Sequence, residues 1–211
     1  MSPPTNLRVV ARPELELAIF ARAALPSRHG DLSIVSFVDA RGRRLDDVAI
    51  LRGDVAGAAA VPTRIHSECL TGDVFGSLRC DCRDQLELAL ARIAAAERGI
   101  ILYLRQEGRG IGIANKVRAY ALQEAGLDTV EANLHLGFDS DLRDYGVAAA
   151  MLRCLEVGSI ALHTNNPEKI RGVVERGVVV VGREAIQAEA HPQNARYLAT
   201  KRERCGHLLE V

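Results

Sequence analysis

The sequence contains no tryptophan, and aromatic residues make up only 4% of its 211 residues. So few aromatic side chains argue against a platform on which single-stranded nucleic acid could stack its bases. The 27 lysines and arginines balance the 27 aspartates and glutamates, so the formal net charge is zero. The chain therefore lacks a global electrostatic attraction to nucleic acid or to a membrane surface, and we predict neither as a partner.

Long apolar runs are also missing, since no stretch approaches the length of a membrane span. Residues 1–8 contain no apolar segment of the kind that a secretory signal needs. The five cysteines are odd in number and unevenly spaced, which does not fit a disulfide framework. We therefore expect a cytoplasmic protein with reduced thiols. Hydrophobic residues make up 48% of the chain, which is enough to bury a sizeable core.

Apolar runs and turn residues predict an α/β fold in which a mixed β-sheet is packed with helices. The first third of the chain is β-rich, with strands expected over residues 32–38, 47–51 and 61–66 and a hairpin turn over residues 39–44. Residues 15–22 fit a strand or a helix equally well. From residue 84 onwards helices and strands alternate. Helices are expected over residues 84–98, 115–125, 145–155 and 167–176, and strands over residues 100–104, 159–163 and 178–181.

Three of the five cysteines lie within residues 64–82, R-I-H-S-E-C-L-T-G-D-V-F-G-S-L-R-C-D-C. Cys69 stands alone, and Cys80 and Cys82 form a C-x-C pair that fits a turn or the start of a helix. Structural zinc usually has four protein ligands, whereas catalytic zinc often has three and keeps one position for water. Three cysteines beside the carboxylate of Glu68 therefore favour catalytic zinc. The alternative is a group of ordinary buried thiols.

A glycine-rich segment, residues 103–120, follows a predicted strand and precedes a predicted helix. Gly108, Gly110 and Gly112 would let backbone N–H groups approach an anion at the start of the helix. Basic side chains in the segment add positive charge: Arg105, Arg109, Lys116 and Arg118. The pattern is neither the dinucleotide fingerprint nor a Walker loop. It indicates either a phosphate cradle or a flexible turn with solvated arginines.

Two further segments could contribute to a site. In D-S-D-L-R-D, residues 139–144, Asp141 and Arg143 could serve as acid–base and phosphate-binding groups, or the segment could be a charge-paired helix entry. In H-T-N-N-P-E-K, residues 163–169, Thr164 and Lys169 could bind phosphate where a strand ends and a helix begins. The alternative there is a strand-to-helix turn capped by asparagine.

Together these segments resemble GTP cyclohydrolase II in order and spacing. The resemblance is carried by R-I-H-S-E-C-L-T-G-D, S-L-R-C-D-C, R-Q-E-G-R-G-I-G, N-K-V-R-A-Y-A-L-Q, D-T-V-E-A-N, D-x-R-D-Y and T-N-N-P-x-K. It covers about residues 27–209, so we divide the chain into an N-terminal extension, residues 1–26, and a catalytic domain, residues 27–211. Arg83 departs from the glycine that the family usually has after C-D-C.

The resemblance implies hydrolysis of GTP with opening of the imidazole ring. Formate, from C8, and pyrophosphate would be released to give 2,5-diamino-6-ribosylamino-4(3H)-pyrimidinone 5′-phosphate, the first step of riboflavin biosynthesis. It further implies one Zn²⁺ per subunit, Mg²⁺ with the triphosphate, and a homodimer. Whether the product serves riboflavin synthesis or a specialised pathway is left open by the sequence.

The resemblance also assigns roles to individual residues. It places the zinc thiolates on Cys69, Cys80 and Cys82. Contacts with guanine and phosphate fall on Arg64, Ile65, His66, Ser67, Glu68, Gln85, Glu107, Gly108, Arg109, Thr129, Thr164 and Lys169. The implied catalytic residues are Tyr120, Asp141 and Arg143. Tyr120 would orient or protonate near the ring, and Arg143 would assist pyrophosphate release as a nucleophile or as an electrostatic clamp, with Asp141 as its base.

Two other functions are consistent with a thiol cluster near a nucleotide site. His66-Ser67-Glu68 matches the H-x-E part of the zinc nucleobase deaminases, although their signature continues with P-C-x-x-C rather than C-x-C. A zinc-stabilised, non-catalytic nucleotide-binding module is the second alternative. Release of ammonia without formate would indicate the deaminase, and GTP binding without turnover would indicate the module.

Overall fold

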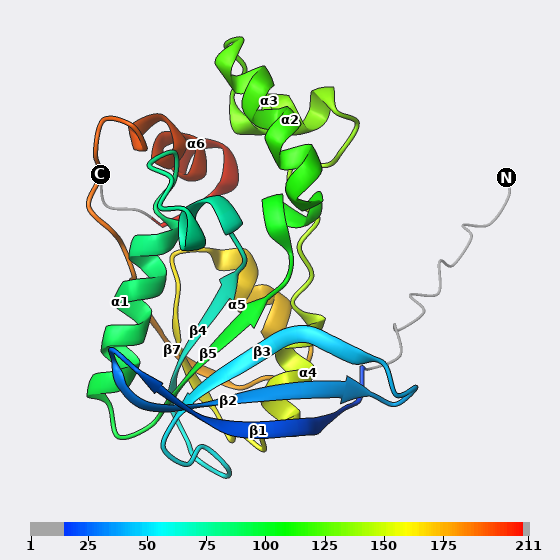
Figure 1. The fold of residues 1–211 in the computed structure, drawn as a ribbon, viewed down its shortest axis with the longest axis vertical. Coiled ribbons are helices and arrows are strands. Elements are labelled where there is room, and N and C mark those ends of the chain that lie inside the picture. The colour runs from blue at the N-terminus through cyan, green and yellow to red at the C-terminus, as the bar shows by residue number, and fades with distance from the viewer. Residues whose placement is uncertain (1–14, 209–211) are drawn as a thin grey trace, which may run out of the picture.

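The computed structural model describes residues 15–208, whose strands form one mixed sheet in the order β1-β2-β3-β5-β4-β6-β7 (Figure 1). The strands are β1 (Leu17–Ser27), β2 (Gly30–Asp39), β3 (Arg44–Arg52), β4 (Val61–Ser67), β5 (Gly99–Leu104), β6 (Ile160–His163) and β7 (Val180–Glu184). The helical elements are η1 (Leu70–Val74), α1 (Cys82–Ala95), η2 (Glu107–Gly110), α2 (Gly112–Glu124), α3 (Thr129–His135), α4 (Gly146–Cys154), α5 (Pro167–Val174) and α6 (Ala195–Cys205). This architecture confirms the expected mixed α/β fold.

The antiparallel half of the sheet contains β1, β2 and β3, with β3 continuing onto β5. The predicted hairpin turn is present, and the carboxylate of Asp39 accepts the backbone N–H groups of Arg41 and Arg43 within it. Of the two readings of residues 15–22, the strand is correct. β1 pairs with β2 from Leu17 to Ser27 and thus begins within the segment 1–26 that we predicted to be an extension. Residues 1–14 of that segment lie outside the described residues, and the division at residue 26 stays a prediction.

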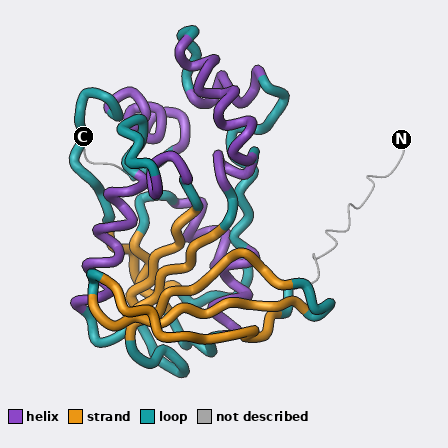
Figure 2. Tube along the Cα trace, viewed as in Figure 1, coloured by secondary structure: helices purple, strands orange, loops and turns teal. Residues whose placement is uncertain are grey.

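The parallel half of the sheet determines where a site can form. Strands β5, β4, β6 and β7 are mutually parallel, so their carboxyl ends lie at one edge. The cysteine segment follows β4, the glycine-rich segment follows β5, and T-N-N-P follows β6. Ligands commonly bind at this edge of an α/β sheet. Figure 2 shows helices and loops gathered beyond this end of the strands.

The core lies on both faces of the sheet because side chains of a strand alternate between faces. On β5, Ile100 and Leu102 belong to the larger core with Met151 of α4, whereas Ile101 packs in a separate cluster with Ile93 of α1. Accordingly, α1 lies along one side of the sheet and α4 behind it (Figure 1). Helices on both faces leave the carboxyl edge of the parallel strands as the place for a pocket.

Two of the α-helices among the described residues, α3 and α6, were not expected from the sequence. In α3, Asp128 and Glu131 form a capping box, a signal that the sequence displays. In α6, basic residues fill the last turn and Gly206 ends the helix in the left-handed conformation. Both helices contribute to the site described below. Within residues 15–208, every helix is too short or too polar to cross a bilayer.

Candidate active site

The three cysteines of the segment 64–82 converge at the carboxyl edge of the sheet. Cys69 follows β4, and Cys80 and Cys82 lie at the turn that begins α1, as the C-x-C spacing predicted. Their Sγ atoms all lie within 4.8 Å of one another, and those of Cys69 and Cys80 are 3.6 Å apart. Tetrahedral zinc with sulfur ligands at about 2.3 Å would separate two sulfurs by roughly 3.8 Å. The three thiols could therefore hold a metal ion together.

Gly72 leaves the space in which the sulfurs meet. A Cβ atom added to Gly72 would lie 3.0 Å from the Sγ of Cys80 and 3.1 Å from the Sγ of Cys69. Real Cβ contacts are rarely this close, so a larger residue would push the sulfurs apart. The backbone of η1 thus forms a cradle that fits a metal–thiolate centre and that a side chain would fill.

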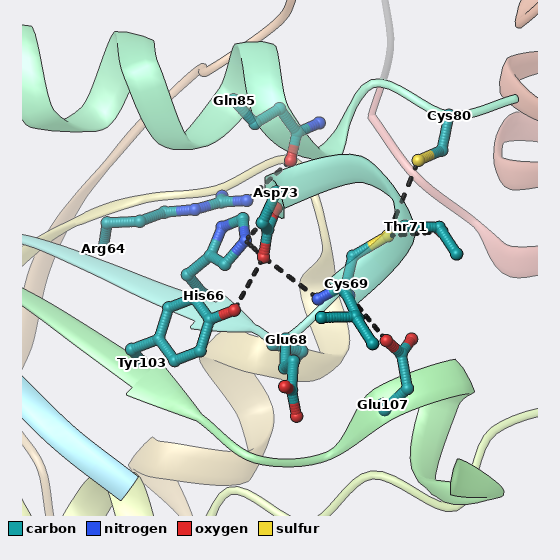
Figure 3. Close-up of polar contacts among 12 residues, drawn as sticks. Arg64, His66, Glu68, Cys69, Thr71, Asp73, Cys80, Gln85, Tyr103 and Glu107 are labelled. Carbon is teal, nitrogen blue, oxygen red and sulfur yellow. Dashed lines mark hydrogen bonds and ion pairs between the residues drawn. The ribbon is translucent and has the colours of Figure 1, made fainter. Parts of the chain in front are cut away.

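The loop that carries Cys69 is fixed by the buried carboxylate of Asp73 (Figure 3). This carboxylate accepts the backbone N–H of Cys69 at 3.0 Å and the hydroxyl of Tyr103 at 2.9 Å. The Nε2 atom of His66 lies 3.1 Å from it, and the His66 ring stacks on Tyr103. His66 therefore faces Asp73, and through this carboxylate β4 and β5 hold the first thiol in place.

A second carboxylate, that of Glu107 in η2, lies on the other side of Cys69. Glu107 accepts the backbone N–H of Leu70 at 2.6 Å and that of Gly108 at 2.7 Å. Its Oε1 also lies 2.7 Å from the Nζ of Lys116, which in turn lies 3.1 Å from the Sγ of Cys69. The lysine that we grouped with the phosphate cradle is thus directed at the thiol and at Glu107.

A pocket of about 330 Å³ opens beside the sulfurs. It is lined by many of the residues that the sequence singled out: Ser67, Glu68, Cys69, Cys80, Cys82, Glu107, Gly108, Arg109, Tyr120, Thr129 and Arg143. These residues come from the end of β4 and the residues after it, from the turn that begins α1, from η2, α2 and α3, and from the loop before α4. The fold therefore brings the cysteine segment, the glycine-rich segment and Arg143 to one cavity.

Tyr120 holds its phenol beside the thiols. Its hydroxyl lies 3.0 Å from the Oγ1 of Thr71, and the guanidinium of Arg79 stacks 4.8 Å above its ring. Burial raises the pKa of Tyr120, so the phenol stays protonated at neutral pH and can donate a hydrogen bond. This is the protonation state that either role expected for Tyr120 requires.

Arg143 joins this pocket to a smaller one of about 210 Å³ that Asp141 lines. The Nε of Arg143 lies 2.8 Å and 3.1 Å from the two carboxylate oxygens of Asp141. Burial lowers the pKa of Arg143, but its hydrogen bonds and charge attraction with Asp141, together with the nearby Tyr145 and Tyr197, raise the pKa on balance. The guanidinium is therefore a charged group, oriented by Asp141, at the pocket wall.

Comparison with known protein families identifies the family of this chain. The family model for GTP cyclohydrolase II matches residues 18–185. The chain belongs to the GTP cyclohydrolase II family. This confirms the resemblance that the separate motifs indicated.

Curated relatives of this chain include shorter and longer proteins. Proteins named GTP cyclohydrolase-2 from Proteus mirabilis and Pectobacterium atrosepticum are 50% and 48% identical to this chain, over 92% and 93% of it and 98% and 100% of their own lengths. A riboflavin biosynthesis protein RibBA from Salinispora tropica is 50% identical over 94% of this chain but only 50% of its own length. The chain thus spans about half the length of the RibBA relatives it matches.

Other residues to which the GTP cyclohydrolase II resemblance assigned substrate contacts lie behind the pocket wall. Among the described residues, the pocket lining does not include Arg64, Ile65, His66, Gln85, Thr164 and Lys169, or the catalytic candidate Asp141. Lys169 donates to the backbone carbonyl of Ile65 at 2.7 Å, and burial lowers the pKa of this lysine. Arg64 donates to Gln85 at 2.6 Å, and burial lowers the pKa of Arg64 to about 10. In this structure the cationic groups of Lys169 and Arg64 therefore bind other groups of the protein behind the pocket.

The C-terminal helix of this family member adds pocket residues that the sequence did not suggest. Tyr197, Thr200 and Lys201 of α6 line the pocket, and His207 follows them. The ammonium of Lys201 lies 2.5 Å from the carboxylate of Asp81, between two of the cysteines. Gly206 after a basic turn could have indicated the end of this helix. The pairing of Lys201 with Asp81 could not be predicted from the sequence.

Proposed function

We propose that this chain hydrolyses GTP, opens the imidazole ring and releases formate and pyrophosphate, as the first step of riboflavin biosynthesis. The observation that carries the proposal is the convergence of three thiols, Tyr120 and Arg143 on one pocket in a member of the GTP cyclohydrolase II family. The pyrimidine product named above would remain after both leaving groups depart. We expect this reaction in the cytoplasm.

We propose Zn²⁺ as the ion held by Cys69, Cys80 and Cys82, and Mg²⁺ as the ion that accompanies the triphosphate. Three thiolates within 4.8 Å of one another match the ligands and spacing that zinc prefers. Bound zinc would supply Lewis acidity, which activates water for hydrolysis at neutral pH. The thiols and the cradle at Gly72 are what this chain contributes to such a centre.

The protein side chains position the nucleotide and stabilise its charges. Tyr120, protonated and held by Thr71, would donate a hydrogen bond to the purine ring beside the thiols. Arg143, which Asp141 keeps charged, would act as an electrostatic clamp on the phosphates. Arg109, Glu107 and the other substrate contacts implied by the resemblance stay predictions. For Lys169 a direct contact would require its ammonium to leave the carbonyl of Ile65.

We also propose that the chain forms a homodimer. The edge strand β1 exposes the apolar side chains of Ile19 and Phe20, which offer a surface that a second copy could cover. Light scattering of the purified protein would measure its mass in solution. A monomer at micromolar concentration would contradict this part of the proposal.

The deaminase alternative is less well supported by the geometry. Zinc deaminases need the histidine of H-x-E as a metal ligand together with cysteines. Here the Nε2 of His66 lies 3.1 Å from Asp73, and Glu68 pairs with Arg105 at 2.9 Å. The metal-ligating group found among the described residues contains the three cysteines alone. Ring opening thus fits the site better than deamination.

The decisive experiment incubates zinc- and magnesium-loaded protein with GTP and measures formate, pyrophosphate, ammonia and the pyrimidine product together. Equal amounts of formate and pyrimidine product are expected. Ammonia without formate would replace the proposal with deamination, and bound but unchanged GTP would indicate a non-catalytic module. Cys80→Ser serves as the control, since it should retain the circular dichroism spectrum of the folded protein and lose formate release.

A further inference from the structure

Three thiolates are strong electron donors, and this creates a chemical problem for a hydrolytic metal centre. With a divalent ion they carry a net charge of −1, and their donation reduces the Lewis acidity that hydrolysis needs. Groups that hydrogen-bond to the ligands are known to tune a metal, and their loss typically costs about 10–100-fold in metal affinity or activity. A positively charged N–H donor on one sulfur would offset part of the donation.

Lys116 occupies this position. Its Nζ lies 3.1 Å from the Sγ of Cys69, within range of an N–H···S hydrogen bond, and its side chain is only 11% exposed. The lysine is on α2, 47 residues from the cysteine, so the contact depends on how α2 packs against η1. A lysine so deeply buried is retained only with a partner for its charge.

Glu107 fixes the direction of that ammonium. Its Oε1 lies 2.7 Å from the Nζ of Lys116, while its two oxygens also accept the backbone N–H groups of Leu70 and Gly108. The two backbone N–H groups fix the carboxylate of Glu107, and the carboxylate in turn fixes the ammonium of Lys116. With one N–H directed to Glu107 and one to the sulfur, the ammonium has at most one N–H left for a ligand in the pocket.

Lys116 lies on the same face of α2 as Tyr120, the proposed hydrogen-bond donor to the purine ring. Lys116 and Tyr120 are four residues apart on α2, so they project from one face. The Nζ of Lys116 lies 5.8 Å from the centre of the Tyr120 ring, and the Tyr120 hydroxyl reaches Thr71 in η1. α2 thus presents one charged and one neutral donor to the cysteine loop.

We propose that Lys116 is a positioning residue that compensates the charge of the metal–thiolate centre, through its hydrogen bond to Cys69 and with Glu107 as its anchor. The inference rests on the proposed function, because a metal centre that does not catalyse hydrolysis would not need the thiolate charge to be compensated. Lys116 tunes the sulfur and does not bind the phosphates of the substrate. Its loss therefore lowers kcat for formate release and leaves the KM for GTP nearly unchanged.

The test uses the full chain loaded with Co²⁺ in place of the native metal, whose thiolate-to-cobalt absorption band is recorded without GTP. In Lys116→Met this band should move to longer wavelength, because the sulfur lone pairs lose their N–H partner. Lys116→Arg, which keeps the charge, should give a smaller displacement. Arg118→Met removes a charge from the exposed side of the same helix and should leave the band in place.

Zinc-loaded variants are then compared in formate release, where Lys116→Met should lose about 10–100-fold in kcat with KM within about twofold. A band in Lys116→Met that coincides with wild type overturns the inference, as does a raised KM with unchanged kcat, which would make Lys116 a phosphate ligand. If Lys116→Met does not fold, an unshifted band in Lys116→Arg overturns it instead. Because the cobalt spectra need no GTP, wild-type protein that fails to turn over GTP contradicts only the proposed function.

Discussion

The ammonium of Lys201 lies 2.5 Å from a carboxylate oxygen of Asp81, and both side chains are buried. Asp81 separates Cys80 from Cys82 in the sequence, so this ion pair fastens α6 to the turn that carries two of the three thiols. The second carboxylate oxygen accepts the amide of Gln85 at 2.6 Å. The C-terminal helix is therefore attached to the wall of the pocket through the turn that carries Cys80 and Cys82.

Removing the positive partner of this pair should destabilise the protein. Lys201→Met would leave the carboxylate of Asp81 buried without its cation, and we expect the free energy of unfolding to fall by about 3–5 kcal/mol. Urea unfolding followed by circular dichroism measures the change. Arg202→Met, which alters an exposed residue of the same helix, should stay within about 0.5 kcal/mol of wild type.

The double variant Asp81→Asn/Lys201→Met checks the cause. With no uncompensated charge left, it should regain a large part of the stability lost in Lys201→Met. If the double variant loses as much unfolding free energy as Asp81→Asn and Lys201→Met lose separately, added together, the ion pair is not the cause of the destabilisation. The loss would then come from the packing of the lysine stem.

The buried imidazole of His66 should make stability depend on pH. Burial lowers the pKa of His66 below its ordinary value of 6.5, despite the opposing attraction of Asp73. The Nδ1 atom of His66 has no hydrogen-bond partner among the described residues, which fits a neutral ring. Below pH 6.5 the unfolded chain takes up a proton that the folded ring resists. The stability contributed by neutral His66 is therefore complete above pH 6.5 and is lost as the pH falls toward the lower folded pKa.

His66→Gln should flatten this part of the pH profile. We expect the slope of unfolding free energy against pH, measured by urea unfolding between pH 7.5 and pH 5.5 or so, to decrease by at most about 1.4 kcal/mol per pH unit, the limit for one proton. His135→Gln, at an exposed position of α3, is the matched control for the loss of an imidazole. Parallel profiles for His66→Gln and wild type would contradict the prediction.

The elements that the sequence predicted correctly are those with local signals. The strand over residues 61–66 and the helix entry at the C-x-C pair follow from periodicity and spacing, and both are present as β4 and the start of α1. The helix α6 was missed because its few apolar residues, such as Leu198, give no clear stripe. Its stability comes instead from contacts such as that of Lys201 with Asp81, 120 residues away.

In the candidate site, too, features with a local sequence signal were predicted and features that depend on packing were not. Motif order was enough to expect Cys69, Cys80 and Cys82 together, and the structure places their sulfurs within 4.8 Å. Charge alone suggested a phosphate contact for Lys116, yet the packing of α2 directs this side chain to a thiol. The contact of Lys169 with the backbone carbonyl of Ile65 could not be predicted either, because the sequence does not say which basic side chains reach a pocket and which are buried.

The role of Arg143 can be separated into two mechanisms by substitution. As an electrostatic clamp, the residue needs only its positive charge, so Arg143→Lys should keep pyrophosphate release within about tenfold of wild type, whereas Arg143→Met should lose about 100-fold or more. The hydrogen bonds of Asp141 with Arg143 raise the pKa of the guanidinium, which disfavours an attack by its nitrogen. Quenched-flow measurement of pyrophosphate would decide. A lysine variant that binds GTP normally and releases none would support the nucleophile.

Gly72→Ala should weaken metal binding without unfolding the protein. The added methyl group would lie 3.0 Å from the Sγ of Cys80 and 3.1 Å from that of Cys69, so the sulfurs must separate to admit it. We expect the dissociation constant for zinc, measured by competition with a chromophoric chelator, to rise by about 10–100-fold. Gly182→Ala is the matched control, since a Cβ there meets no atom within 4 Å.

The comparison of these two glycine variants tests the cluster independently of catalysis. If the thiols hold a metal, the cost of the Gly72 methyl group appears in metal affinity and the circular dichroism of the metal-free protein changes little. If the cysteines are ordinary buried thiols, the same methyl group disturbs only packing, and the cost appears as lost unfolding free energy with or without zinc. Equal zinc affinity in Gly72→Ala and Gly182→Ala would therefore exclude Gly72 as the cradle of a metal site, because its backbone lies against the sulfurs that must close around the ion.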